Sequence, residues 1–171
     1  KVAEGLQYGN SPFEYPRHFI EGQTLVLTTT NGTRLLHMAL NNGASDIITG
    51  SFANLGAVCH YLVSSNKPVV LACAAWKDRV NIEDSLFAGM VIQKIGDAFT
   101  VNCDASKMVV GLYEQAKDDL YGYMERNQAS HYLRLSGYGL HEDIRYCLSP
   151  NTASALPLYS EGKLINHKIS Q

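Results

Sequence analysis

A repeated alternation of short apolar runs and longer amphipathic segments constrains the fold of this chain more than any other feature. The strand-like runs are 24–30, 46–51 and 68–75. The segments with apolar residues at helical spacing are 33–43, 53–66 and 82–96. Because the connections are short, parallel strands with right-handed crossovers are favoured. The sequence therefore predicts an α/β fold, a three-layer α/β/α sandwich around a mainly parallel or mixed sheet.

The C-terminal half contains three further helical patterns and one hairpin. Residues 104–128 form a long amphipathic pattern, and two shorter ones follow at SHYLRLSGYG (130–139) and HEDIRYCLS (141–149). Residues 155–167 are typical of a β-hairpin that turns at Glu161-Gly162. At 171 residues, the chain is long enough for one well-buried domain and short for two. We therefore expect residues 1–171 to form a single domain.

Composition and charge exclude several classes of function. The net charge is −2 and the charges are scattered, which argues against nucleic acid or an anionic membrane as a partner. No apolar run approaches the roughly 20 residues that a membrane span needs. The four cysteines form no CxxC motif and sit in apolar stretches. Free thiols in a reducing compartment, and hence a cytoplasmic protein, are the expectation.

Polar residues follow the strand-like runs, where the carboxyl ends of parallel strands would meet. Ligands of open parallel sheets bind at such ends, and helix N-termini there favour phosphate or sulfonate. The candidate substrate-binding residues at these ends are Thr30, Asn31, Gly32, Thr33, Ser51 and Asn54. The alternative is that these residues only cap helices, since Thr and Asn are good N-caps. The GxxxxGK[ST] pattern of a P-loop is absent.

Glu83 and Asp84, at the start of the helix predicted after the third run, are the candidate catalytic carboxylates. Adjacent carboxylates supply the oxygen ligands that Mg²⁺ uses together with water and substrate phosphate. Neighbouring helix positions point about 100° apart, so we expect one of the two to face the site. The alternative is that both only stabilise the helix N-terminus. The basic candidates for neutralising a bound dianion are Lys77, Arg79 and Arg34, the last in the first turn of its predicted helix. The alternative for each is a solvated surface charge, which is favoured for Lys77.

Taken together, several motifs resemble the 2-phosphosulfolactate phosphatase (ComB-like) family, in the right order along nearly the whole chain. They are GNSP (9–12), TTTNGTR (28–34), GSFxN (50–54), CAxW (73–76), Glu83-Asp84, Ala88-Gly89 and HEDIRYC (141–147). The resemblance adds Asn10 and Ser11 of GNSP to the substrate-binding candidates. Two departures stand out. The family's N-terminal strand–helix segment has no counterpart here, and Ala75 stands where the family pattern tends to have glycine.

The resemblance implies a Mg²⁺-dependent phosphatase that converts 2-phospho-3-sulfolactate to 3-sulfolactate and phosphate. Glu83 and Asp84 would then hold the metal, and the chain would form the larger, C-terminal part of the family's domain. The family is best known from coenzyme M biosynthesis, although it has relatives where that coenzyme is not made. A homodimer is a further expectation. Two alternatives stay open, namely a phosphatase of another small phosphorylated hydroxy-acid and a non-catalytic anion-binding domain.

Overall fold

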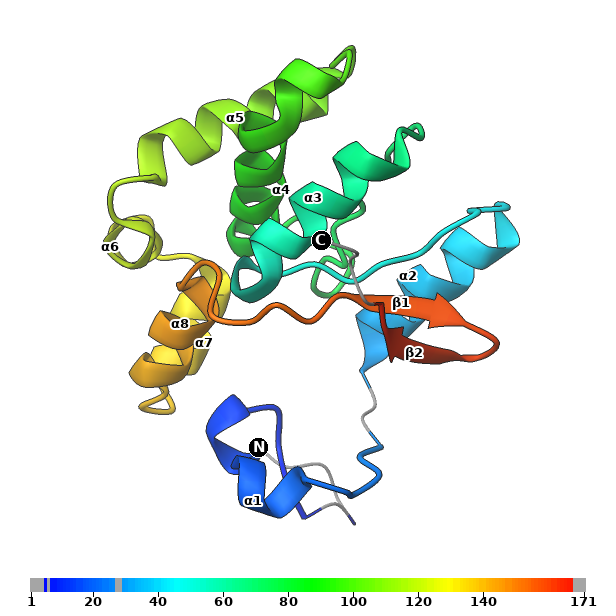
Figure 1. The fold of residues 1–171 in the computed structure, drawn as a ribbon. Helices are drawn as coiled ribbons and strands as arrows, with labels where there is room; N and C mark the ends of the chain where they lie inside the picture. The colour runs from blue at the N-terminus through cyan, green and yellow to red at the C-terminus, as the bar shows by residue number, and fades with distance from the viewer. Residues whose placement is uncertain (1–4, 6, 27–28, 168–171) are drawn as a thin grey trace.

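The computed structural model describes residue 5 and residues 7–26 and 29–167 (Figure 1). A short N-terminal part comes first, with the 3-10 helix η1 (Pro12–Glu14) and the helix α1 (Arg17–Ile20), and it lies below the main body in Figure 1. It contacts the body through the rings of Phe13 and Tyr146, whose centroids are 5.4 Å apart. The body begins with α2 (Thr30–Asn41).

Most of the body is helical. Its elements in order are α2, η2 (Phe52–Asn54), α3 (Leu55–Ser65), α4 (Ile82–Ile95), η3 (Gly96–Ala98), α5 (Asp104–Ala116), α6 (Leu120–Arg126), α7 (Ser130–Ser136), α8 (His141–Leu148), β1 (Pro157–Ser160) and β2 (Lys163–Asn166). The helices predicted at 53–66, 82–96 and 141–149 are therefore present to within two residues at each end. The helix predicted over 104–128 is two helices, because the chain turns after Ala116 and Asp119 caps α6 by accepting from the Gly122 N–H at 2.8 Å.

The hydrophobic core follows α4, which lies between α3 and the later helices. One cluster packs α4 against η2, α5, α6, α7 and α8, and the other packs it against α3 and the chain around Leu156. Leu86 and Val91 of α4 are fully buried, one in each cluster. Gly89 permits the close approach of α5, since a Cβ there would lie 2.1 Å from the Val109 carbonyl oxygen. The helix α4 is therefore the element that fixes the others in place.

The described residues do not confirm the predicted parallel sheet and its three layers. Their one sheet has two strands, β1 and β2, paired antiparallel with Leu158 opposite Ile165. The predicted hairpin is confirmed, and Glu161 and Gly162 turn it with φ of 48° and 84°. The chain thus combines helices with a small β-sheet, and the coarse α/β description holds.

Two of the three predicted strands are extended chain with few sheet contacts. In 46–51, Ile48 forms an isolated antiparallel bridge with Leu158, and the Thr49 N–H donates to Pro157 O at 3.0 Å. In 68–75, Val70 is 89% exposed and no ladder forms. A strand needs a neighbouring backbone to accept and donate its hydrogen bonds, and none lies along 68–75 within the part of the chain that the structure describes. The run 24–30 includes residues 27–28, outside the described residues, and its end at Thr30 already belongs to α2.

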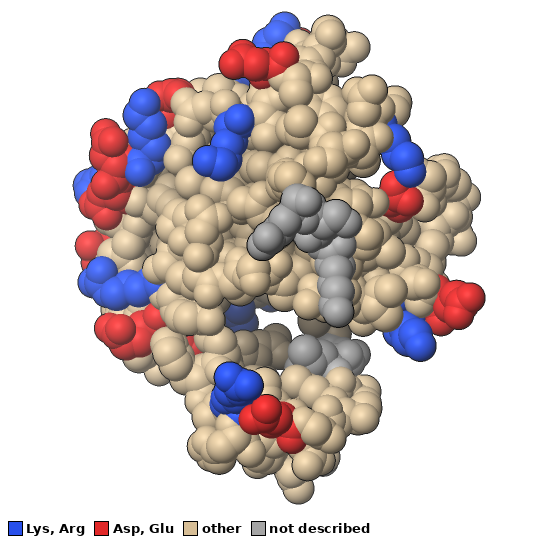
Figure 2. Space-filling model, in the orientation of Figure 1, with Lys and Arg blue, Asp and Glu red and all other residues tan. Residues whose placement is uncertain are grey.

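The surface carries charges of both signs without a large patch of either. On the face shown in Figure 2, Lys, Arg, Asp and Glu lie mainly around the edge, with both signs near one another, and the middle is largely uncharged. This distribution agrees with the scattered charge in the sequence. Over residues 5, 7–26 and 29–167, no helix is both long enough and apolar enough to cross a membrane.

Candidate functional site

A tight turn at residues 75–79, hereafter the 75–79 turn, is the point where several predicted site residues meet. Trp76 and Arg79 close it with two backbone hydrogen bonds, of 3.1 and 3.0 Å. Three of its residues have positive φ: Ala75 at 62°, Lys77 at 52° and Asp78 at 58°. This is the left-handed region that non-glycine residues enter only at a cost. The backbone of the turn is therefore strained at these three residues.

Residues from the starts of two helices hold the 75–79 turn. Asn31 of α2 donates its side-chain N–H to Ala75 O at 2.7 Å, and the Ala75 N–H donates to Asp84 Oδ2 of α4 at 3.2 Å. Arg34 of α2 donates to the Asp78 carboxylate, and this hydrogen bond raises the pKa of Arg34. Three residues singled out in the sequence, Asn31, Arg34 and Asp84, thus lie around one turn.

Glu83 makes a different contact, with His131 near the start of α7. Its Oε1 lies against His131 Nδ1, and the two side chains are only 21% and 20% exposed. Both carboxylate oxygens of Glu83 and His131 Nε2 are buried and have no hydrogen-bond partner among the described residues. Burial lowers the pKa of His131, and Arg134 lowers it further. The lowered pKa favours the neutral imidazole of His131, which lies in contact with the Glu83 carboxylate.

The two adjacent carboxylates consequently serve different parts of the site. Asp84 faces the 75–79 turn, whereas Glu83 faces α7. The 100° between neighbouring helix positions accounts for this divergence. Asn81 caps α4 by accepting from the Asp84 N–H at 3.3 Å. Asn81 thus supplies the N-cap of the helix. The Asp84 side chain is not needed as a cap and can accept the hydrogen bond from the turn.

The other predicted binding residues fall into three groups. Thr30, Gly32 and Thr33 lie in the first turn of α2, beside Asn31, because α2 begins three residues earlier than the sequence predicts. Asn54 is buried, and its Nδ2 donates to Thr49 O and Ala155 O at 3.1 and 3.0 Å.

Asn54 also accepts from the Ser51 N–H, at 2.8 Å. Its polar atoms are therefore engaged in joining two chain segments. Asn10 and Ser11 lie in the N-terminal part, where Ser11 Oγ accepts from the Phe13 N–H at 3.3 Å. No hydrogen bond between described residues joins Asn10 or Ser11 to the 75–79 turn.

The structure adds Trp76, His131 and Arg134 to the neighbourhood of the turn. The Trp76 ring centroid is 5.2 Å from that of His131 and 5.5 Å from the Arg134 guanidinium carbon. His131 and Arg134 are three residues apart on α7, so they share one helix face. That spacing is visible in the sequence, but nothing there says which element the face meets.

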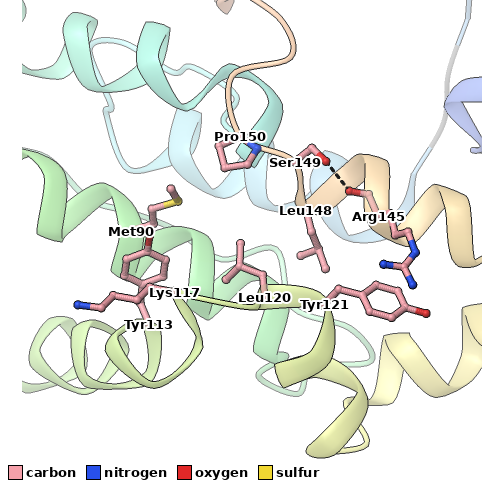
Figure 3. A pocket seen from close by; sticks show the side chains of 9 residues that line it. All are labelled: Met90, Tyr113, Lys117, Leu120, Tyr121, Arg145, Leu148, Ser149 and Pro150. Atoms are coloured by element: carbon pink, nitrogen blue, oxygen red, sulfur yellow. Dashed lines mark hydrogen bonds between the residues drawn. The ribbon is translucent and has the colours of Figure 1, made fainter.

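A separate cavity lies between α4, α5, α6 and α8, and none of the residues that line it belongs to the 75–79 turn (Figure 3). Its volume is about 340 Å³. Of its two cations, Lys117 is paired with Glu114 at 2.7 Å, which leaves only Arg145, whose guanidinium carbon lies 3.8 Å from the Tyr121 ring centroid. The cavity is therefore a poorer place for a phosphate than the 75–79 turn.

A turn with its own cations, framed by two helix starts and a carboxylate, has the composition of a small-anion site in an α/β protein. A family model described as 2-phosphosulpholactate phosphatase matches residues 1–162. The chain belongs to this family.

Relatives named "Probable 2-phosphosulfolactate phosphatase" resemble most of the chain. The one from Caldanaerobacter subterraneus is 34% identical over 160 residues, which cover 93% of this chain and 65% of the relative. Those from Clostridium acetobutylicum and Thermotoga maritima are each 32% identical and cover 95% of this chain and 68% of the relative. The chain thus spans about two thirds of the length of these relatives.

Proposed function

We propose that this protein is a phosphoric monoester hydrolase that cleaves 2-phospho-3-sulfolactate to 3-sulfolactate and phosphate. The family match over residues 1–162 supports the substrate. The observation that carries the proposal in the structure is the convergence of Asn31 and Asp84 on Ala75. This convergence puts a neutral donor, a carboxylate and the start of α2 beside one another, as a phosphate-ester site requires.

The proposal includes Mg²⁺, and the residues around the turn fit one mode of holding it. Mg²⁺ is commonly bound through one or two carboxylates, with waters and substrate phosphate completing its shell. Asp84 suits this mode, because it is only partly buried and one of its oxygens accepts from the Ala75 N–H. Glu83 does not, since it is closed against His131 and water cannot reach its oxygens. We therefore assign the metal to Asp84 and not to the adjacent pair.

Within the described residues, no group of three or more His, Cys, Asp or Glu side chains gathers as a zinc-type site would. A single carboxylate agrees better with a hard cation that substrate oxygens help to hold. When bound, Mg²⁺ would offset negative charge on the phosphoryl group.

The residues of the chain supply binding and orientation around that centre. Asn31 and the first turn of α2, with Gly32 and Thr33, present N–H and hydroxyl donors to an oxyanion. Arg34 adds a fixed positive charge, which Asp78 orients by accepting its hydrogen bond. His131 holds Glu83 away from the turn, and this arrangement keeps a second carboxylate from repelling the substrate.

Phosphate release from a panel of esters tests the proposal. The full-length protein should release phosphate from 2-phospho-3-sulfolactate faster than from 2-phospholactate or 3-phosphoglycerate, and EDTA should abolish the release. Preference for one of the other two esters would favour a different hydroxy-acid phosphatase. Phosphate binding without release from any ester would make the protein a non-catalytic anion-binding domain.

The proposal extends to the setting of the reaction. Cys59, Cys73, Cys103 and Cys147 are all free, which fits a reducing compartment such as the cytoplasm. The proposal also includes a role in coenzyme M biosynthesis and a homodimer in solution. Light scattering on the purified protein tests the dimer directly.

A further inference from the structure

The helix α7 brings a further positive charge, Arg134, to the 75–79 turn, from a part of the chain that none of the recognised motifs includes. Lys77 Nζ lies 4.6 Å from the Trp76 ring centroid, and the Arg134 guanidinium carbon lies 5.5 Å from the same centroid. Both distances are within the range of about 6 Å over which a cation interacts with an aromatic ring. Both cations therefore lie beside the Trp76 ring, and we call Lys77, Trp76 and Arg134 the Trp76 patch.

These two cations differ from Arg34 in their pairing with carboxylates. Arg34 is paired with Asp78, whereas neither Lys77 nor Arg134 has an acidic partner within 4.0 Å among the described residues. Glu83, which meets this face of α7, is in contact with His131. Two like charges that share one ring repel each other, and a bound anion would remove that cost.

The ring itself is suited to hold the cations in place. Trp76 is half-buried, and His131 packs against it with a centroid distance of 5.2 Å and an interplanar angle of 59°. The backbone on either side is fixed by the two hydrogen bonds between Trp76 and Arg79. The patch therefore lies on a preorganised turn, so less conformational entropy is lost when a ligand binds.

We propose that Lys77 and Arg134, beside Trp76, bind the non-reacting anionic group of the substrate. This group is a sulfonate. The inference rests on the proposed function, which supplies a phosphate ester bearing a second strong anion. Asn31 and Asp84 lie on the phosphate side of the turn, and the Trp76 patch offers a second, separate anion site. A guanidinium binds an oxyanion through two parallel N–H groups, so Arg134 is the specificity-determining residue.

Two substrates that differ only in the sulfonate test this assignment. For the full-length protein, the ratio of kcat/KM for 2-phospho-3-sulfolactate to kcat/KM for 2-phospholactate should fall about 10- to 100-fold in Arg134→Gln. Lys77→Gln should lower the same ratio by a smaller factor, and Arg134→Lys should recover part of it. Arg126→Gln is the matched control, because Arg126 is an exposed arginine that pairs with Asp119 on α6. The ratio should be unchanged in this control.

Binding of 3-sulfolactate, measured by calorimetry, gives a second readout that does not depend on turnover. Its Kd should rise at least about 10-fold in Arg134→Gln. An equal loss of activity on both substrates, or an unchanged ratio and Kd, would overturn the assignment. If the wild-type protein hydrolyses neither ester, the proposed function fails. The calorimetric comparison then still decides whether this patch binds a sulfonate.

Discussion

At Ala75, the structure gives a backbone reason for the glycine that the family pattern tends to have. The family pattern tends to have glycine here, and the sequence suggests only that a methyl group could crowd a ligand. In the structure, Ala75 has φ of 62°, a conformation that costs an ordinary residue about 1–2 kcal/mol and glycine almost nothing. Its N–H and C=O both bind site residues, and these two hydrogen bonds hold it in that conformation.

The contact between Glu83 and His131 predicts how stability depends on each residue. His131→Phe keeps a ring against Trp76 but removes the nitrogen that faces the Glu83 carboxylate. A carboxylate left without a partner in a closed site is costly, so the free energy of unfolding should fall by about 1–3 kcal/mol. Urea denaturation at pH 7.5 measures it. Exposed His37 provides a control, and His37→Phe should change the stability by less than about 0.5 kcal/mol.

The double variant Glu83→Gln/His131→Phe separates a specific contact from a general packing defect. His131→Phe leaves the charge of Glu83 without its partner, and Glu83→Gln removes that charge. The double variant should therefore lose less stability than the sum of the two single losses. Strictly additive losses would contradict the contact.

The cysteines provide a prediction about pH. The backbone N–H groups of Ser106 and Ala105, at the start of α5, lower the pKa of Cys103. Burial raises the pKa of Cys59, which is 5% exposed. A lower pKa means more thiolate at a given pH, so Cys103 should be alkylated by iodoacetamide before Cys59 from pH 7 to pH 8. Peptide mass spectrometry follows both sites, and equal rates throughout would refute the prediction.

At the scale of the elements, the contact between α4 and α5 depends on one small residue. A Cβ at Gly89 would lie 2.1 Å from Val109 O and 2.8 Å from Tyr113 Cβ. Gly89→Ala should therefore force the two helices apart and reduce stability by about 1–3 kcal/mol or more. The matched change Gly111→Ala, on α5, meets nothing within 4 Å and should raise stability by about 0.5–1 kcal/mol. Thermal melting of both variants checks the pair, and opposite signs are the expected result.

The helices could be predicted from the sequence because their signals are local. Apolar spacing located α3, α4 and α8, and Glu161-Gly162 located the hairpin turn, since each feature depends on residues close together in the chain. The start of α2 was wrong by three residues. Thr30, Asn31 and Gly32 suggest a loop, and their helical conformation became visible only in the structure.

The candidate site could be predicted in part for a similar reason. Asn31, Arg34 and Asp84 were identifiable from their positions at helix starts. His131 and Arg134 act from α7, some fifty residues along the chain from the turn, and their proximity to Trp76 depends on helix packing. Sequence spacing within α7 shows that the two share a face, but it does not show which part of the chain packs against that face.

For the whole molecule, the difference between the predicted and observed sheet has a physical origin. An apolar run encodes burial of its side chains, whereas a strand also needs another backbone at hydrogen-bonding distance. Val70 is 89% exposed in a run that reads as a buried strand. The run does not specify which segment would pair with it, so the alternation of apolar runs and helical patterns predicted a sheet that the described residues do not confirm. This chain spans about two thirds of the length of its relatives.

The central claim is that Asp84 and the 75–79 turn form the active site of a phosphatase. The most direct test is kcat/KM of the full-length protein for 2-phospho-3-sulfolactate in Asp84→Asn. Asparagine can still accept from the Ala75 N–H but lacks the charge, so the turn should persist while kcat/KM falls at least about 100-fold. Asp104→Asn is the control, because Asp104 also lies in the first turn of a helix but is exposed. It should retain wild-type activity. An Asp84→Asn variant as active as the wild type at low Mg²⁺ would contradict the account and place the active site elsewhere.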